Sequence, residues 1–324
     1  MSERLAATRD AYGETLVGLG RMNKNIVVLD ADLSPSTKTN LFAKEFPDRF
    51  FDVGIAEANL ISVAAGLASV GKIAFASTFS VFGVEKGLNQ FKQSVAYPNI
   101  NVKLVTTHGG ISVGEDGSSH FCIEDIAIMR SLPNVTVIIP ADAIETKVAT
   151  KAIAEYHGPV FMRLSRPKTP LIYDEGYRYQ DRDLNFKIGK SVTLRDGNDV
   201  TILATGLMVA ESLQAANDLA KEGIAAGVIN IHTIKPIDRE AILQAALSTG
   251  ALVTVEEHNI IGGLGGAVAE VLVEEAPVPM IRVGIRDTYG ESGPWRELFA
   301  KYGLTSSDVA KAVKEVLKRK IKWR

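Results

Sequence analysis

The segment Thr106–His120 gathers side chains that can move protons or hold a polar ligand. It contains His108 and His120, two of the five histidines of the chain, together with Asp116 and several glycines. The segment follows an apolar run and is too polar for a core, so we expect a loop that presents these groups to a ligand. Acid–base or substrate-binding roles suit histidines at such a place. A metal site built from His108, His120 and Asp116 is open on ligand type, although their irregular spacing lacks a metal-binding signature.

A second candidate is Glu57, which lies in Phe51–Asn59 among glycine and small apolar residues. A carboxylate in such dry surroundings is costly to desolvate unless it hydrogen-bonds a specific partner or shares a proton with one. The alternative is a first-turn glutamate that interacts favourably with the dipole of the helix that follows. The residues alone leave both interpretations open.

A third polar segment, Leu29–Ser36, follows another apolar run and contains Asp30, Asp32, Ser34 and Ser36. Short polar side chains of this kind either cap a helix or contact a ligand. Open α/β sheets bind their ligands at the carboxyl ends of parallel strands. We therefore expect all three polar segments at that edge of one sheet.

The elements that must position these residues alternate between short β-branched runs and longer segments of helical period. This alternation predicts an α/β fold with a mainly parallel sheet. The first series of predicted strands comprises Ile26–Asp30, Ile73–Ser77, Val102–Thr106, Val135–Ile139 and Val160–Arg163. The helices predicted between them are Ala58–Val70, Phe82–Val95, Ile123–Ser131 and Ala143–Tyr156.

Prolines, tyrosines and charged residues interrupt the pattern from Pro167 to Asn198, which predicts a linker there. A second series of predicted strands follows, at Val200–Ala204, Ala226–Asn230, Ala251–Glu256 and Met280–Val283. The helices predicted with them are Val209–Glu222, Arg239–Leu247, Gly263–Glu275 and Ser307–Lys318. We therefore expect a larger first domain over residues 1–185 and a smaller α/β domain over residues 186–324, as the length of 324 residues allows. The basic run Lys311–Arg324 is interpreted as the solvated end of a C-terminal helix.

Composition places the chain among globular proteins, with 46% hydrophobic and 23% charged residues. A formal net charge of -2 gives no overall attraction for nucleic acid or for an anionic membrane, so we expect neither partner. No stretch approaches the roughly 20 apolar residues that span a bilayer. The single cysteine, Cys122, and the lack of a signal-like apolar core in residues 1–20 indicate a cytoplasmic protein.

Several motifs, taken together in order and spacing, resemble one known family. In the first domain these are Gly54–Glu57, Ser77–Phe82, Gly114–His120, Leu132–Asp142 and Leu164–Arg166. They are similar to the pyrimidine-binding domain of transketolases, which use thiamine diphosphate. In the second domain, Ile202–Gly206 and Val255–Gly266 are similar to the C-terminal domain of the same family. The resemblance covers nearly the whole chain.

The resemblance implies a role for each matching residue in binding the cofactor. Glu57 is implied as the carboxylate that hydrogen-bonds a ring nitrogen of the aminopyrimidine and so promotes formation of the nucleophilic ylid. Phe79 and Phe82 match aromatic positions that pack against the pyrimidine ring. Asp32 matches an aspartate near the cofactor.

The resemblance also implies a binding site for a sugar phosphate. His108 and His120 match histidines that line the substrate channel, and Asp116 matches an aspartate that contacts a sugar hydroxyl. The phosphate would be held by a set of polar side chains in which arginine forks suit phosphate oxygens. The set comprises Arg9, Ser36, His108 and Arg166.

Two departures from the family pattern qualify these expectations. Here Phe121-Cys122 follow His120, where the family usually has glutamine and proline, so the shape of the substrate channel is expected to differ. A Gly-Asp-Gly run, which holds a divalent metal on the diphosphate in full-length transketolases, does not occur in this sequence. The chain therefore resembles the C-terminal subunit of a split transketolase. An N-terminal partner subunit would hold Mg²⁺ or Ca²⁺, and the expected assembly is a dimer or an α2β2 heterotetramer.

Three alternatives stay open at this stage. The chain resembles in part the beta subunit of a 2-oxoacid dehydrogenase and a piece of 1-deoxyxylulose-5-phosphate synthase, which are also thiamine-diphosphate enzymes. The polar set around Arg9 and Arg166 favours a phosphorylated sugar over an oxoacid. A non-catalytic scaffold subunit is the third alternative, but a fold alone has no need of Glu57, His108 and His120.

Overall fold

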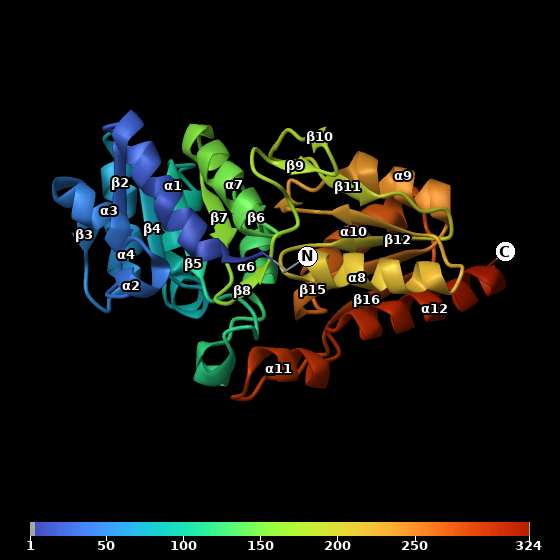
Figure 1. Ribbon diagram of the computed structural model, residues 1–324. Helices are drawn as coiled ribbons and strands as arrows, with labels where there is room; N and C mark the ends of the chain where they lie inside the picture. Colours follow the sequence, from blue (N-terminus) through green and yellow to red (C-terminus); the bar gives the residue numbers. More distant parts are fainter. Residues whose placement is uncertain (1–3, 324) are drawn as a thin grey trace.

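Two β-sheets with helices on both faces lie side by side in the computed structural model, which describes residues 4–323 (Figure 1). The predicted α/β class is therefore confirmed, with a mainly parallel first sheet and a smaller mixed sheet. Residues 1–3 of the N-terminal segment and Arg324 of the basic run lie outside the described residues.

The first sheet has seven strands in the order β14-β6-β7-β5-β4-β2-β3. All neighbours are parallel except β14, which is antiparallel to β6. Buried apolar runs form the central strands, as expected for a parallel sheet covered on both faces. The strands are β2 (Ile26–Asp30), β3 (Phe50–Asp52), β4 (Ile73–Phe79), β5 (Val102–Thr107), β6 (Thr136–Ile138), β7 (Val160–Arg163) and β14 (Thr233–Lys235).

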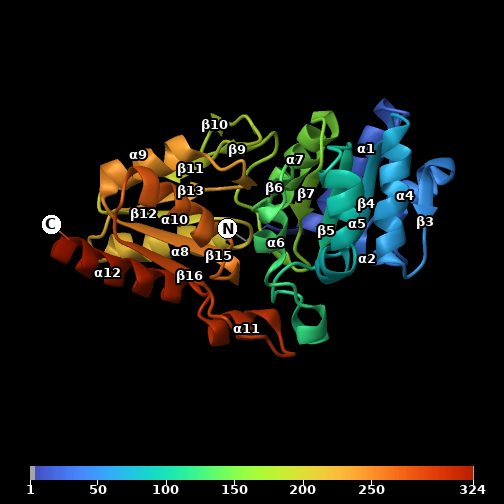
Figure 2. The ribbon, with the colours of Figure 1, turned by 180° about the vertical axis from the view of Figure 1, so that it is seen from behind.

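Helices cover both faces of this sheet. On one face, α1 (Thr8–Met22) packs against α7 (Ala143–Glu155) and α3 (Asn40–Glu45), as Figure 1 shows. On the other face lie α4 (Glu57–Ser69), the short α5 (Leu88–Gln90) and α6 (Asp125–Ser131), in front in Figure 2. The side chain of Asp142 caps α7 by accepting a 2.8 Å hydrogen bond from the Glu145 N–H, which explains why that helix begins where the sequence predicts.

The predicted continuous helix Phe82–Val95 is wrong in its detail. The segment instead contains two π-helical stretches, η2 (Phe82–Lys86) and η3 (Phe91–Ala96), separated by Gly87 and α5. A Cβ atom on Gly87 would lie 2.5 Å from the carbonyl oxygen of Gly83, so only glycine fits this widened turn. Such wide turns often occur beside functional sites.

The second sheet has five strands in the order β11-β13-β12-β15-β16, all parallel except β11. Its helices α8 (Met208–Lys221) and α12 (Ser306–Trp323) pack together, and α9 (Arg239–Thr249) packs against α10 (Leu264–Glu275). Below them in Figure 1, α11 (Trp295–Tyr302) lies next to the loop at Gly114–Asp116. The strands are β11 (Val192–Arg195), β12 (Val200–Ala204), β13 (Ala226–Asn230), β15 (Leu252–Asn259) and β16 (Met280–Ile285).

The predicted linker contains regular structure and must be corrected. Its first part includes β8 (Lys168–Pro170), which pairs with β1 (Leu5–Ala7) beside α1. Its middle forms a small hairpin of β9 (Arg178–Tyr179) and β10 (Arg182–Asp183), and its end is β11 of the second sheet. These strands have two to four residues, too few for an apolar pattern to reveal, and β8 and β11 pair with strands that are distant in sequence. The division at residues 185 and 186 stays a prediction.

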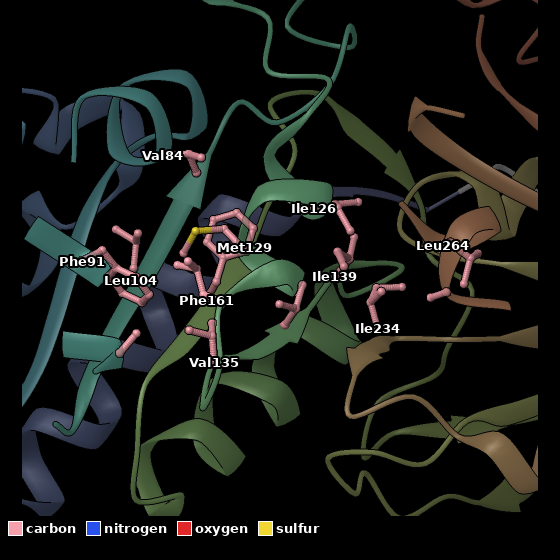
Figure 3. Close-up of a cluster of buried hydrophobic side chains, with 14 of the residues drawn as sticks. Val84, Phe91, Leu104, Ile126, Met129, Val135, Ile139, Phe161, Ile234 and Leu264 are labelled. Carbon is pink, nitrogen blue, oxygen red and sulfur yellow. The ribbon is translucent and has the colours of Figure 1, made fainter. Parts of the chain in front are cut away.

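One of the hydrophobic clusters spans both sheets, and the others lie mainly within one domain. Figure 3 shows Ile126 of α6 and Ile139, which follows β6, near Ile234. Leu264 of α10 lies further along the same cluster. Ile234 belongs to β14, which follows the second domain's β13 in sequence but extends the first sheet. Among the described residues, no helix has both the length and the apolar character needed to cross a membrane.

Candidate active site

Four aromatic rings meet at the carboxyl ends of β4 and β5. Phe79 ends β4, Phe82 begins η2, His108 directly follows β5, and His120 ends the short helical turn Ser118–His120. Phe79 stacks on His108 with ring centres 3.7 Å apart, and it stacks at 5.9 Å on Phe82. His120 meets the Phe82 ring edge-on at 5.5 Å. The structure thus brings these four predicted residues together at the edge where such sheets bind ligands.

His108 is held in an unusual backbone conformation. Its φ angle is +60°, a region that non-glycine residues seldom adopt and that is often found at functional sites. The ring is buried, and its Nδ1 lies 2.7 Å from the Thr107 hydroxyl. Burial, followed by the positive charges of Arg9 and Arg166, lowers the pKa of His108 to about 3. This imidazole is therefore neutral near pH 7.

Glu57 is the first residue of α4 and is almost completely buried, with 4% of its surface exposed. Its Oε2 atom lies 3.4 Å from the ammonium nitrogen of Lys86. The same ammonium lies 4.6 Å from the centre of the Phe82 ring. Lys86 is half-exposed at the end of a flexible chain, so a ligand can displace it without disturbing the core.

Two guanidinium groups lie close enough to His108 for their charges to lower its pKa. Arg9 of α1 donates a 3.0 Å hydrogen bond from Nη1 to the backbone carbonyl of Ser36, while its buried Nε has no partner among the described residues. Burial lowers the pKa of Arg9, Asp10 raises it, and the nearby Arg166 lowers it again. This unbalanced positive charge favours an anion.

Arg166 follows β7 and is held by one of its terminal nitrogens. Its Nη1 donates to the backbone carbonyl of Val113 at 2.6 Å and to the Glu115 carboxylate at 2.8 Å. A guanidinium has five N–H donors, so Nη2 and Nε keep the paired edge that binds carboxylates and phosphates.

The remaining predicted residues lie at the rim. Asp116 is exposed in the helical turn Gly114–Asp116. Asp32 is exposed in the turn after β2, with φ of +61° and its N–H donating to Asp52 at 3.1 Å. The Ser36 contact with Arg9 uses the backbone carbonyl rather than the hydroxyl. The ligand-binding roles of Asp116, Asp32 and Ser36 remain predictions.

The metal interpretation of His108, His120 and Asp116 finds no support in their geometry. The two histidines pack against phenylalanine rings, and Asp116 points to the exposed rim. Within the described residues, the ligand atoms close enough to share an ion belong to Glu85, Cys122 and Glu124, within 4.8 Å of one another.

Sequence reasoning placed Asp30 in a polar segment but did not identify its part in organising the site. Asp30 is buried and accepts hydrogen bonds from the Leu33 N–H at 2.7 Å and from the hydroxyls of Thr37 and Thr39 at 2.6 and 2.8 Å. Burial raises the pKa of Asp30 to about 6. The carboxylate thus shapes the turn that presents Ser36. Its position at the end of a strand, inside the polar segment Leu29–Ser36, was the available signal.

Comparison with known proteins agrees with the resemblance that the sequence motifs indicate. Residues 5–171 match the pyrimidine-binding domain of transketolase, and residues 189–309 match the transketolase C-terminal domain. A chain from Methanocaldococcus jannaschii, named as a transketolase C-terminal section, is 50% identical over 312 residues, which cover 96% of each chain. A 6-deoxy-6-sulfo-D-fructose transketolase subunit from a Clostridium species is 45% identical over 312 residues, covering 96% of this chain and 95% of that one.

A solved structure shares the whole architecture. It is a split-gene transketolase described as an inactive β4 tetramer, with a TM-score of 0.89 and 52% identity over 96% of this chain and 98% of that chain. The fold and the matched domains define an α/β protein of the thiamine-diphosphate-dependent class. Within that class, the chain belongs to the transketolase family. The resemblance deduced from the sequence motifs is thereby confirmed.

Proposed function

We propose that this chain is the C-terminal subunit of a split, thiamine-diphosphate-dependent transketolase. Together with an N-terminal subunit, it would transfer a two-carbon ketol unit from a ketose phosphate to an aldose phosphate. One observation carries the proposal: His108 stacks on one of two stacked phenylalanines and feels the charges of two guanidiniums, while Lys86 joins the Phe82 ring to a buried carboxylate. The name of the Methanocaldococcus relative and the two matched domains support the division into subunits.

The residues present fit the pyrimidine half of the cofactor. Glu57 is a buried carboxylate whose contact is the displaceable tip of Lys86, and Phe79 and Phe82 offer aromatic surface beside it. When bound, thiamine diphosphate supplies the carbon nucleophile that accepts the two-carbon unit. Glu57 would hold a proton against a ring nitrogen, and the phenylalanines would fix the plane of the ring. The partner subunit would hold the diphosphate through Mg²⁺ or Ca²⁺.

The sugar would lie between the aromatic cluster and the guanidiniums. A terminal phosphate would bind the free edge of Arg166 and the unpartnered Nε of Arg9, because charge-assisted bonds to phosphate are strong. His108 is neutral, so it can donate to or accept from a sugar hydroxyl without a net charge. His120 would line the same channel, and Asp116 would contact a hydroxyl at its entrance.

The terminal anion could also be a sulfonate. The Clostridium relative is named for a sulfofructose substrate, and guanidiniums bind sulfonate and phosphate oxygens alike. We favour phosphate because Arg9 and Arg166 bring two guanidiniums to one site, of which Glu115 offsets part of the charge of Arg166. The family match favours this reaction over that of a 2-oxoacid dehydrogenase beta subunit.

In the cell we expect a cytoplasmic α2β2 complex with the catalytic site between unlike subunits. The solved relative, described as an inactive tetramer of β chains, supports a need for the other subunit. We assign residues 1–185 to the pyrimidine-binding domain and residues 186–324 to the C-terminal domain, limits that contain the matched regions.

The decisive experiment replaces Glu57 in the complex with its N-terminal subunit. Glu57→Ala should reduce two-carbon transfer by roughly 10²- to 10⁴-fold, the usual effect of losing a positioned acid–base group. Cofactor affinity, measured by calorimetry, should fall only modestly because the rings and the partner's metal remain. Glu155→Gln, which removes an exposed charge at the end of α7, is the control. If the Glu57→Ala complex exchanged the thiazolium proton for deuterium at the wild-type rate, the catalytic assignment would be wrong.

A further inference from the structure

The loop that carries His108, Asp116 and His120 is anchored by the second domain. We call residues 108–120 the substrate loop. Glu257 of β15 accepts a 2.6 Å hydrogen bond at Oε1 from the backbone N–H of Ser112, near the middle of this loop. The Glu257 side chain is 3% exposed, so water does not compete for that bond.

Two glycines after His108 allow this close approach. A Cβ atom on Gly109 would lie 2.2 Å from Nε of Arg163, and one on Gly110 would lie 2.2 Å from Oε1 of Glu257. Gly110 also has a φ of +81°, which disfavours other residues, and its N–H donates to the Cys122 carbonyl at 2.9 Å. The loop therefore begins by lying directly on the Arg163 and Glu257 side chains.

Arg163 connects this anchor to the first domain. Its Nε donates to Asp125 at 2.8 Å, and its Nη2 donates to the backbone carbonyl of Glu257 at 2.8 Å. Arg163 and Asp125 are both buried. His258, which is also buried, lies 3.9 Å from Asp125 and 3.8 Å from Glu256. Removal of one member of such a buried, charged network leaves the others without compensation, so the network resists change.

From these contacts we infer that Glu257 is a positioning residue through which the C-terminal domain holds the substrate loop. The bond to Ser112 and the fit of Gly110 against the carboxylate fix the chain that leaves His108. The unusual φ of His108 is thereby maintained by a contact from the other domain. The consequence for sugar binding rests on the proposed function, whereas the anchoring of the loop does not.

The adjacent residue supplies a matched control. Glu256 is also buried on β15, but it accepts from the N–H groups of Leu264 and Gly265 at 2.6 and 2.8 Å, at the start of α10. Successive side chains of a strand point to opposite faces, which explains the different partners. Glu256 variants should thus disturb the start of α10 more than the substrate loop.

Hydrogen exchange of the isolated, full-length chain tests the anchor directly. Glu257→Ala should accelerate exchange of the Ser112 amide by about 10-fold or more, since a buried bond to a charged group is lost. Glu257→Gln keeps an acceptor oxygen and should restore much of the protection. Glu256→Ala should instead accelerate exchange of the Leu264 and Gly265 amides. Unchanged protection of Ser112 in both Glu257 variants would overturn the inference.

Kinetics of the assembled complex test the functional consequence. Glu257→Ala should raise KM for the sugar donor several-fold more than it lowers kcat, while cofactor affinity stays at the wild-type value, and Glu257→Gln should restore most of the wild-type KM. Glu256→Gln should change KM less than Glu257→Ala does. Should Glu257→Ala fail to fold, Glu257→Met, which removes the acceptor oxygen but keeps a side chain of similar length, decides both arms. A complex without transferase activity in its wild-type form would refute the proposed function, yet the exchange result would still decide whether Glu257 anchors the loop.

Discussion

The ammonium of Lys86 lies 3.4 Å from the Glu57 carboxylate and 4.6 Å from the centre of the Phe82 ring. These are the same two surfaces that would receive the cofactor's pyrimidine ring in the proposed function. A flexible cation thus covers a buried carboxylate and an aromatic face at once. Because Lys86 is half-exposed, its contacts are weak enough to be exchanged for a ligand.

We predict that Lys86→Met strengthens cofactor binding to the assembled complex by about 2- to 5-fold, since a partly exposed ion pair is worth up to roughly 1 kcal/mol. The isolated variant chain should also unfold at a lower temperature, because Glu57 loses its cation. Calorimetry and thermal unfolding measure the two effects. Lys92→Met, which removes an exposed lysine of η3, is the control. Weaker cofactor binding in Lys86→Met would instead identify the lysine as a ligand contact.

Arg9 and Arg166, the two arginines near His108, should discriminate between donors by charge. Arg166→Ala and Arg9→Ala are expected to raise KM for phosphorylated donors roughly 10- to 150-fold, which corresponds to the 1.5 to 3 kcal/mol of a charge-assisted hydrogen bond. Unphosphorylated donors serve as the internal control and should change little. Equal losses on both kinds of donor would show that the arginines only support the structure.

Because of Glu257, the free energy of unfolding should rise as the pH falls from 8 to 5. Burial is the main cause that raises its pKa to about 7 from the ordinary 4.5, although Arg163 and the Ser112 N–H act in the opposite direction. At pH values between 4.5 and 7, Glu257 is protonated in the folded chain and ionised in the unfolded chain. Proton binding therefore stabilises the folded chain more and more as the pH falls through this range.

Relative to Glu257→Gln, the wild-type chain should therefore gain about 2 to 3 kcal/mol of unfolding free energy between pH 8 and pH 5. Urea unfolding of both chains at several pH values gives this difference. Glu297→Gln removes an exposed carboxylate and should show no such trend relative to wild type. A difference that stays constant with pH would contradict the raised pKa.

Catalysis should require the second subunit. The isolated chain is predicted to show no two-carbon transfer, and activity should appear on mixing with an N-terminal transketolase subunit, thiamine diphosphate and magnesium. Light scattering after size exclusion should give the mass of two chains of each kind. Full activity of the purified chain by itself would contradict the division of the cofactor site between subunits.

The sequence predicted the fold where the determinants are local. Strands such as Ile26–Asp30 and Val200–Ala204 are continuous apolar runs, and their observed bounds agree with the prediction. Strand β14 was missed because its three residues pair with β6, about a hundred positions earlier in the chain. No local pattern carries that information. The π-helical turns were missed although Gly83 and Gly87, which approach closely there, are only four positions apart, because a helical period does not distinguish a π turn from an α turn.

The residues of the candidate site were likewise predicted only in part. Motif spacing identified Phe79, Phe82, His108 and His120, which do meet at one sheet edge. The residues that hold them in place, such as Lys86 and Glu257, were not identified. Their roles come from contacts across the fold, and a lysine in a helical segment is ordinarily a solvated surface residue. The motif Val255–Gly266 does contain Glu257, but the sequence does not state what it contacts.

Strand β14 has a consequence for any attempt to separate the two halves of this chain. It covers the edge of β6 by pairing Thr233 with Ile138 and Lys235 with Val137. A fragment ending near residue 185 would leave that edge of the sheet open, together with the apolar side chains around Ile139 that Ile234 now covers. Exposed strand edges of this kind recruit other chains and lead to aggregation. A chimera that joins one half of this chain to the other half of a relative would therefore have to take β14 and β6 from the same protein.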